Sequence, residues 1–430
     1  MLLPDTAART AGDRLSVGGC DLVELAHRFG TPLYVFDEAT LRARLRGYRE
    51  ALRQWPAGGE VLYSAKAYLG RAMVGILRDE DCGIDVVSGG ELSIALEAGM
   101  PPAWIGFAGN NKDAAEVEAA LGAGIGHLVI DSDHELDLLA ASPRRPSAGA
   151  LVRISPGIRP DTHDFISTGQ LDSKFGFGVD SGQAMVALRR AIGVGAIDLR
   201  GVHMHIGSQI FDLRCYPAAI GIAAGLLAAA RDELGFVARE LSVGGGLGIA
   251  YTDDDDPPTP REFMSVVTES VGAVFGERGL PLPALLVEPG RSVAGPAGVA
   301  LYTVGGRKEI PGVRTYVAVD GGMGDNIRPK LYGARYQPML AGDAERRPVE
   351  TVTIAGRYCE STDILAHDVE LPRLVPGDVI AVPASGAYSL AMASNYNVNP
   401  RPAVVFVGDG RARLVRRRET LDDMLRCEVG

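Results

Sequence analysis

The sequence predicts an α/β fold: a (β/α)8 barrel of the TIM type, with a second, mostly antiparallel β domain. Between about residues 60 and 290, eight short apolar runs alternate with helical patterns. This number of β/α units over this length is typical of a barrel of ~250 residues. An open, doubly wound sheet is the competing α/β arrangement. After Pro289 the apolar runs are separated by Gly and Pro turns with little helix between them, as in an antiparallel β domain.

The elements follow from these patterns in order along the chain. The eight expected barrel strands cover residues 60–64, 84–87, 104–107, 127–131, 150–155, 199–206, 240–244 and 284–288. The clearest helices between them are expected over 90–98, 112–122, 181–192, 216–234 and 261–278. The later β-rich runs are "VALYTVGGRKE", "TYVAVDGG", "VETVTIAG", "DVIAVPASG" and "AVVFVGDG". We expect a barrel domain over 34–296, and a β domain made of 297–430 and the N-terminal segment 1–33.

The composition and net charge of the chain argue against some classes of partner and of site. The chain has 430 residues, 46% of them hydrophobic, and a net charge of −11, which argues against nucleic acid or an anionic membrane as the main partner. No targeting segment is visible, and the apolar run from Ala218 to Ala230 is too short to span a bilayer. The five cysteines are scattered and form no CxxC, so neither a disulfide framework nor a metal site is expected, and a reducing cytoplasm fits best.

Lys66 stands in "YSAKAY", directly after the first expected strand. Among small and aromatic neighbours it should be poorly solvated, and desolvation favours the neutral, nucleophilic amine. The alternative is a lysine that extends its charged end to solvent from a strand end.

Other unusual residues follow other strands of the expected barrel. "HIGS", from His205 to Ser208, ends the sixth; "GGGLG" follows the seventh; and "EPGR", from Glu288 to Arg291, ends the eighth. All of them therefore fall on the carboxyl face, where barrel enzymes hold their active sites. The glycine run does not fit G-x-G-x-x-G, because Ile249 takes the last position. It better suits backbone N–H groups around a phosphate, with a flexible turn as the alternative.

Glu288 is the most informative of these residues. A carboxylate at the end of a buried strand is costly unless a cation or a strong donor meets it, and a pyridinium nitrogen would be such a partner. A lysine, a phosphate cradle, an acid for a ring nitrogen and a flat imidazole together describe a site for pyridoxal phosphate. Taken singly, His205 could be a satisfied core histidine, and Glu288 could belong to an ordinary salt bridge.

Long motifs along nearly the whole chain carry a family resemblance. They are "YSAKAY", "GIDVVSGGEL", "GNNK", "STGQLDSKFGFG", "HMHIGSQI", "GGGLG", "EPGRS", "DGGMGDNIRPKLYGA", "CESTD" and "GAYSLAMASNYN". The chain resembles the barrel-type pyridoxal-phosphate-dependent amino-acid decarboxylases, and specifically the diaminopimelate decarboxylase family. The resemblance implies that Lys66 carries the cofactor, that His205 stacks on its ring and that Glu288 pairs with the ring nitrogen. It also implies a wider set of cofactor-binding residues: Asp85, Ser208, Gly244, Gly245, Gly246, Gly290, Arg291 and Tyr388.

The same resemblance implies a substrate site. Arg328 and Tyr332 match the positions that grip the distal carboxylate of diaminopimelate, and Glu360 matches the acceptor for the distal amino group. Arg291 and Tyr388 are implied as further substrate contacts. Cys359 matches the proton donor, so the implied catalytic residues are Lys66, Cys359, His205 and Glu288. The family also implies a homodimer with shared active sites.

The expected activity is decarboxylation of meso-2,6-diaminopimelate to L-lysine and CO2, a carboxy-lyase reaction of lysine biosynthesis. The chain departs from the family at Tyr68, where asparagine is common, and at Thr362, where glycine is common; "GRYC" also replaces the usual lead-in to the cysteine. These departures leave open a related decarboxylase for ornithine, lysine, arginine or a secondary-metabolite precursor. A racemase of the same cofactor class and a non-catalytic regulatory homologue are the remaining alternatives.

Overall fold

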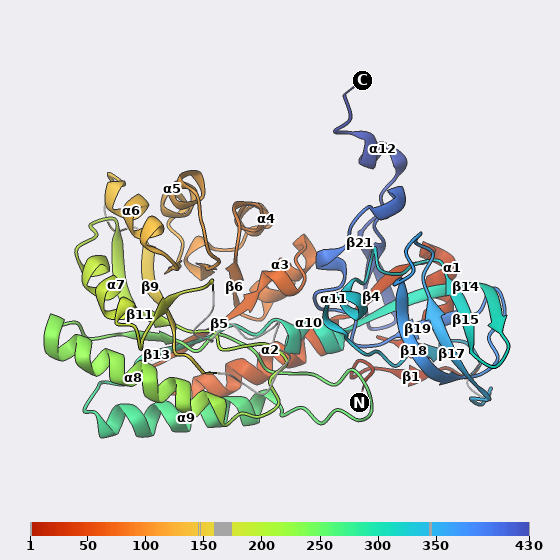
Figure 1. Cartoon of the computed structure of the whole chain (residues 1–430), viewed down its shortest axis with the longest axis horizontal. Helices are drawn as coiled ribbons and strands as arrows, with labels where there is room; N and C mark the ends of the chain where they lie inside the picture. The colour runs from red at the N-terminus through yellow and green to blue at the C-terminus, as the bar shows by residue number, and fades with distance from the viewer. Residues whose placement is uncertain (1, 145, 147, 159–173, 344–345, 430) are drawn as a thin grey trace. The chain divides into compact units, whose positions relative to one another are not determined.

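The computed structural model describes residues 2–144, 146, 148–158, 174–343 and 346–429 (Figure 1). The chain divides into two compact units, and each is described by itself. The barrel unit comprises Arg44–Gly248 and Pro257–Ser292, and the β unit comprises Met1–Ala43, Ile249–Asp256 and Val293–Gly430. The limits given above for the two domains stay a prediction. Residues 167–173 of the motif "STGQLDSKFGFG" lie outside the described residues.

The barrel unit contains a closed parallel sheet. Its strands are β5 (Gly59–Ser64), β6 (Gly83–Val86), β7 (Ile105–Phe107), β8 (His127–Ile130), β9 (Ala148–Ser155), β11 (Ile197–His203), β12 (Glu240–Ser242) and β13 (Ala284–Val287). Each strand pairs in parallel with its neighbours, β13 pairs with β5, and the β8–β9 pairing completes the ring. All eight predicted strands are therefore confirmed, and the open doubly wound sheet is excluded. A short strand β10 (Phe177–Gly178) pairs with β9.

Helices surround the outside of the sheet; one precedes its first strand and the others follow later strands (Figure 1). They include α2 (Glu38–Arg53), α3 (Arg71–Asp79), α4 (Gly89–Glu97), α5 (Ala114–Ala123), α6 (Asp133–Ala141), α7 (Gln183–Ile192), α8 (Cys215–Leu234) and α9 (Pro260–Glu277). The five clearest predicted helices are confirmed. Helix starts are set locally: Asp113 and Thr259 form capping boxes with Glu116 and Glu262, which satisfy the free N–H groups of the first turn. Inside the sheet, Leu62, Leu151 and Leu286 pack together.

The β unit is built on a mostly antiparallel sheet, as predicted. Its strand order is β18 (Ile364–Leu371), β17 (Glu350–Ala355), β15 (Arg314–Val319), β14 (Gly298–Ile310), β4 (Leu33–Asp37), β20 (Ala403–Gly408) and β21 (Arg411–Arg416). Within it, β15–β17 and β20–β4 are parallel pairs. Strand β19 (Val379–Val382) pairs with β14 and with β16 (Met339–Leu340). A small sheet of β1 (Ala8–Arg9), β2 (Leu15–Val17) and β3 (Cys20–Asp21) precedes α1 (Leu22–Phe29).

Shorter helices of the β unit include α11 (Arg328–Tyr332) and, near the C-terminus, α12 (Leu421–Leu425). Another short helix, α10 (Arg291–Ala297), follows β13.

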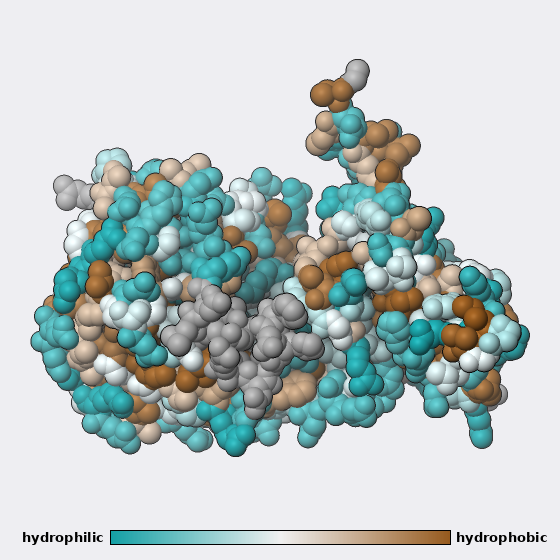
Figure 2. Space-filling view, viewed as in Figure 1, coloured by the Kyte–Doolittle hydropathy of each residue, from teal (hydrophilic) through white to brown (hydrophobic). Residues whose placement is uncertain are grey.

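Hydrophilic side chains cover much of the face seen in Figure 2, with hydrophobic ones scattered among them. Within the described ranges, none of the helices has the length and apolar character needed to cross a membrane.

Candidate active site

Lys66 lies in a short 3-10 turn (Ala65–Ala67) that directly follows β5, at the carboxyl end of the barrel. Ala65 and Ala67 are buried, but Lys66 itself is exposed. The prediction of a poorly solvated lysine is therefore wrong. In this turn the two alanine side chains pack against the strand end, and the lysine side chain extends away from it. The lysine charge still acts on its surroundings, because it opposes the rise in the pKa of nearby Asp85.

Asp85 lies in β6 and is buried, with Ser64 Oγ 3.5 Å from its Oδ2. Burial raises the pKa of Asp85 well above its usual value, and the negative charge of Glu288 raises it further. The Glu288 carboxylate and the Lys66 amine therefore both act on the pKa of Asp85, at the carboxyl ends of the barrel strands. A buried carboxyl whose pKa is shifted by burial and by specific charged neighbours is a frequent mark of a functional site.

Glu288 directly follows β13 and is 8% exposed. Its Oε1 accepts a hydrogen bond of 2.6 Å from Ser242 Oγ, and its Oε2 lies 3.0 Å from His203 Nε2. Burial alone would raise the pKa of Glu288, but the charge and hydrogen bond of His203, helped by Ser242, outweigh it and hold the pKa below its usual range. The carboxylate is therefore ionised at neutral pH, as a partner of a protonated ring nitrogen must be.

His203 and Arg153 also belong to this cluster, and neither was predicted from the sequence. His203 is 1% exposed and ends β11, where it is the register partner of Ser242 in β12. It stands two residues before His205, and this alternation, which puts both side chains on one face of an extended chain, could have identified it. Arg153 is buried in β9, 3.4 Å from Asp131. A charged residue inside the apolar run "ALVRIS" was the signal for it.

His205 lies in the loop after β11, since this strand ends at His203 and not at residue 206 as predicted. The backbone N–H of Gly245 donates a hydrogen bond of 3.3 Å to His205 Nδ1. Burial, together with the positive charge of Lys66, holds the pKa of His205 well below its usual value. The imidazole is therefore neutral with its proton on Nε2, and a neutral flat ring suits stacking against a cationic pyridinium.

The glycine run after β12 is required by close backbone contacts. A Cβ on Gly244 would lie 2.6 Å from Met204 O, and one on Gly245 would lie 2.2 Å from Glu288 O. Gly246 has φ +115°, and a Cβ there would lie 2.7 Å from Gly207 O. These distances are too short for any side chain, so the run is not merely a flexible turn. The run is packed closely against the chain that follows β11 and β13, and the N–H groups of Gly244 and Gly245 donate to Ser242 Oγ and His205 Nδ1. A role of the run around a phosphate stays a prediction.

Arg291 and Ser208 add donors beside this glycine run. Arg291 is buried, and its Nε and Nη2 lie 3.3 and 2.9 Å from Ser208 Oγ. Gly290 lets the backbone approach the Lys66 turn, because a Cβ there would lie 3.0 Å from Ser64 Cβ and 3.1 Å from Ala67 Cβ. The barrel unit therefore gathers the lysine, the acid, the imidazole and the anion-binding groups that fit pyridoxal phosphate.

The β unit holds the predicted substrate residues other than Arg291, which lies in the barrel unit. Arg328 begins α11 and is 4% exposed, with its guanidinium carbon 4.5 Å from the ring centroid of Tyr251. Its Nη1 donates to Tyr336 Oη, and among the described residues its buried Nε has no hydrogen-bond partner. Tyr332 is half-buried at the end of α11. Tyr388 is half-buried with φ +59°.

Cys359 and Glu360 lie between β17 and β18. Cys359 is exposed, and its backbone N–H donates a hydrogen bond of 2.8 Å to Asn397 Oδ1. Glu360 accepts hydrogen bonds from the backbone N–H and the hydroxyl of Thr362, at 3.2 and 3.1 Å. The backbone hydrogen bond from Thr362 lowers the pKa of Glu360.

Comparison with known proteins identifies the family of the chain. A family model described as "Pyridoxal-dependent decarboxylase, pyridoxal binding domain" matches residues 38–295. The chain is 44% identical to the diaminopimelate decarboxylases of Halalkalibacterium halodurans and Bacillus subtilis, covering 100% of this chain and 98% of each relative. A solved diaminopimelate decarboxylase from M. jannaschii in complex with L-lysine is 35% identical, with a TM-score of 0.92 over 100% of this chain and 99% of that one. The chain belongs to the diaminopimelate decarboxylase family.

Two of the three departures from this family's motifs, Tyr68 and Thr362, lie in different surroundings. Tyr68 is buried, and its carbonyl accepts a hydrogen bond of 2.9 Å from Tyr63 Oη. Thr362 adds a hydroxyl donor to the Glu360 carboxylate that a glycine could not supply. Across the described part of the chain, no group of three or more His, Cys, Asp and Glu side chains is placed to hold a metal ion.

Proposed function

We propose that this protein decarboxylates meso-2,6-diaminopimelate to L-lysine and CO2, with pyridoxal phosphate as its cofactor. The observation that carries the proposal is the full-length similarity to diaminopimelate decarboxylases from several bacteria. It is an enzyme, a carboxy-lyase of lysine biosynthesis. Such a reaction breaks one C–C bond, releases CO2 and places one proton on the carbon that remains.

In this proposal, the barrel unit holds the cofactor. Pyridoxal phosphate, when bound, withdraws electrons from the substrate carbon so that CO2 can leave. Lys66 is the residue of covalent attachment, and its exposed amine beside Asp85 suits that role. The ionised Glu288 would accept a hydrogen bond from the protonated ring nitrogen, and the neutral His205 would lie against the ring. The glycine run with Ser208, Gly290, Arg291 and Tyr388 would bind the phosphate.

The substrate assignment depends on the distal carboxylate. Ornithine and lysine have no carboxylate at the far end, whereas diaminopimelate does, and a planar guanidinium binds a carboxylate through two hydrogen bonds. Arg328 supports this choice because it is buried, contacts Tyr251 and Tyr336, and retains a buried N–H without a partner among the described residues. Tyr332, Tyr388 and Arg291 are proposed to assist.

Proton delivery and assembly complete the proposal. Cys359 donates the proton to the carbon that loses CO2, and Glu360 accepts the distal amino group. The protein acts as a cytoplasmic homodimer with two shared active sites, each combining Lys66 of one chain with Cys359 of the other. A two-fold dimer makes the two sites equivalent.

The substrate test is CO2 release from meso-diaminopimelate beside lysine, ornithine and arginine, with product chirality measured to detect a racemase. Release from diaminopimelate alone supports the proposal. Faster release from another amino acid would favour a related decarboxylase, and no release from any would favour a regulatory homologue. Borohydride reduction of the cofactor-loaded protein should fix the cofactor on Lys66, and peptide mapping that found it on another lysine would contradict the attachment site.

A further inference from the structure

A strained turn lies beside Cys359 in the β unit. The turn Tyr396–Val398 has Asn397 at φ +53° and Val398 at φ +55°. Asparagine tolerates this left-handed conformation, but a β-branched valine rarely adopts it. Val398 is also 62% exposed, so core packing does not account for its conformation. Such strain persists only where the surrounding contacts hold the turn in place, and it is often found at functional sites.

One side of the turn holds the backbone of Cys359. Asn397 Oδ1 accepts the hydrogen bond of 2.8 Å from the Cys359 N–H. The ring of Tyr396 stacks on that of Tyr358, the residue before Cys359, with centroids 6.1 Å apart and an interplanar angle of 20°. The position of the thiol therefore depends on where this turn is held.

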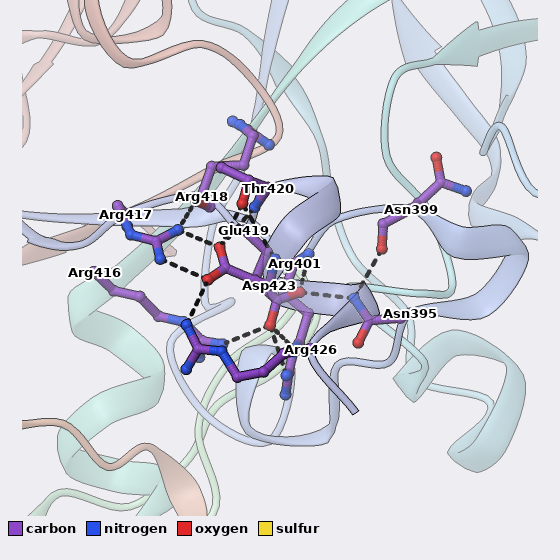
Figure 3. A network of polar contacts seen from close by, with 10 residues as sticks. All are labelled: Asn395, Asn399, Arg401, Arg416, Arg417, Arg418, Glu419, Thr420, Asp423 and Arg426. Atoms are coloured by element: carbon purple, nitrogen blue, oxygen red, sulfur yellow. Dashed lines mark hydrogen bonds and ion pairs between the residues drawn. The ribbon is translucent and has the colours of Figure 1, made fainter. Parts of the chain in front are cut away.

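The other side of the turn is anchored by Glu419, from the C-terminal segment (Figure 3). The Glu419 side chain is only 13% exposed. Its Oε2 accepts hydrogen bonds from Asn395 Nδ2 at 2.7 Å and from the Arg401 N–H at 2.9 Å, and its Oε1 accepts one of 2.6 Å from Arg401 Nε. Burial would raise the pKa of Glu419, but these donors outweigh it and lower the pKa.

Glu419 therefore joins the two ends of residues 395–401, which we call the strap. Asn395 Nδ2 also donates to Asn399 O at 3.0 Å, which closes the strap on itself. We propose that Glu419 is a positioning residue for Cys359 and acts through the strap. This inference rests on the proposed role of Cys359 as proton donor. The carbon that loses CO2 gains one proton, and a thiol held in one place delivers that proton to one face.

The test compares Glu419→Gln with Asp423→Asn in the cofactor-loaded protein. Asp423 belongs to the same C-terminal segment and loses the same charge, but its carboxylate bonds Thr420 and Arg417 of that segment (Figure 3). In Glu419→Gln we expect amide hydrogen exchange at Cys359 to rise about tenfold, since the loss of one charged hydrogen bond is worth about that factor. We expect kcat to fall at least about fivefold with KM changed less than about twofold, because a small misplacement of a reacting group costs rate.

A stereochemical readout separates positioning from general loss of structure. In D2O the wild type should place deuterium on one face of the product carbon, and Glu419→Gln should give a mixture. Asp423→Asn should match the wild type in exchange, kcat and stereochemistry. Asn397→Gly removes the acceptor while keeping the positive φ accessible, so it should reproduce the effects of Glu419→Gln and serves if that variant does not fold.

Three results would overturn the inference: normal exchange at Cys359 in both strap variants, normal kcat and stereochemistry in both, or equal losses in Asp423→Asn. If the wild type releases no CO2 from diaminopimelate, the proposed function fails. Amide exchange at Cys359 then still tests whether Glu419 holds the strap.

Discussion

Replacing His203 with leucine tests whether this residue keeps Glu288 ionised for the cofactor ring. In the wild type, Glu288 has donors on both oxygens, at 3.0 Å from His203 and 2.6 Å from Ser242. Since His203 is 1% exposed and Glu288 is 8% exposed, the leucine variant leaves one oxygen without a ready substitute for the lost donor. A hydrogen bond to a charged group contributes about 1.5–3 kcal/mol, which corresponds to roughly a 10- to 150-fold change in an equilibrium constant.

We therefore expect His203→Leu to bind pyridoxal phosphate roughly 10-fold or more weakly, as measured by equilibrium dialysis of the cofactor-free protein. The pKa of Glu288 should rise because its largest stabilising partner is gone while burial remains. An acid limb set by Glu288 in the pH profile of kcat/KM would then move to higher pH, since the ionised form is the one required. His203→Gln is the matched control, because its side-chain N–H2 can still donate, and it should lose less than the leucine variant.

The melting temperature of each variant shows whether the barrel has stayed intact. If His203→Leu is folded, binds the cofactor as tightly as the wild type and keeps the same acid limb, then the ionisation of Glu288 does not depend on His203. In that case Ser242 and the other charges of the site would have to keep Glu288 ionised. Ser242→Ala would then weaken cofactor binding more than His203→Leu does.

Three other predictions follow from the structure. Arg328→Lys should raise KM for diaminopimelate about tenfold or more, because a bidentate pair is worth roughly 1.5–3 kcal/mol, while the visible absorbance of the bound cofactor is unchanged; an unaltered KM would place the distal carboxylate elsewhere. Lys66→Ala and Cys359→Ala should each be nearly inactive, yet a fully exchanged mixture should recover about a quarter of wild-type activity, since about half the dimers hold one intact site. Recovery of nothing, with exchange shown by mass, would place both residues in one chain. Burial raises the pKa of Asp325 from 3.8 to about 7, so the folded protein binds a proton that the unfolded chain has lost, and this group makes stability fall as pH rises from about 4 to about 7. Asp325→Asn should abolish this loss of stability, which amounts to up to about 4 kcal/mol. The melting temperature of the variant should therefore change less between pH 5 and 8 than that of the wild type, and parallel curves of melting temperature against pH would refute the assignment.

The barrel could be predicted because its signal is local. Each strand is a short apolar run, several helices begin at a side-chain cap, and the carboxyl ends of the strands carry the unusual residues. The solvation of Lys66 could not be read in the same way, since it depends on a three-residue turn that exposes one side chain and buries its neighbours. The surroundings of Arg328 were also hidden, because Tyr251 lies far from it along the chain.

Glu288 shows most clearly what could not be predicted from the sequence. The sequence indicated that this acid needs a partner, but not that His203 and Ser242 already meet both of its oxygens. Those contacts arise from the register of three neighbouring strands, which places the ends of β11, β12 and β13 together. The register between two strands about 40 residues apart cannot be predicted from the sequence of either strand alone.

The same arrangement bears on how the enzyme can be altered. The two donors that tune Glu288 are the last residues of β11 and β12, and Glu288 itself follows β13, so the electronic character of the cofactor ring would be set by the barrel frame. The residues proposed to read the distal end of the substrate are mostly on the loops and the short helix α11 of the β unit. Selectivity could therefore drift, or be engineered, by exchanging β-unit loops without retuning the chemistry of the ring. Substitutions at the three strand ends would instead affect every substrate alike.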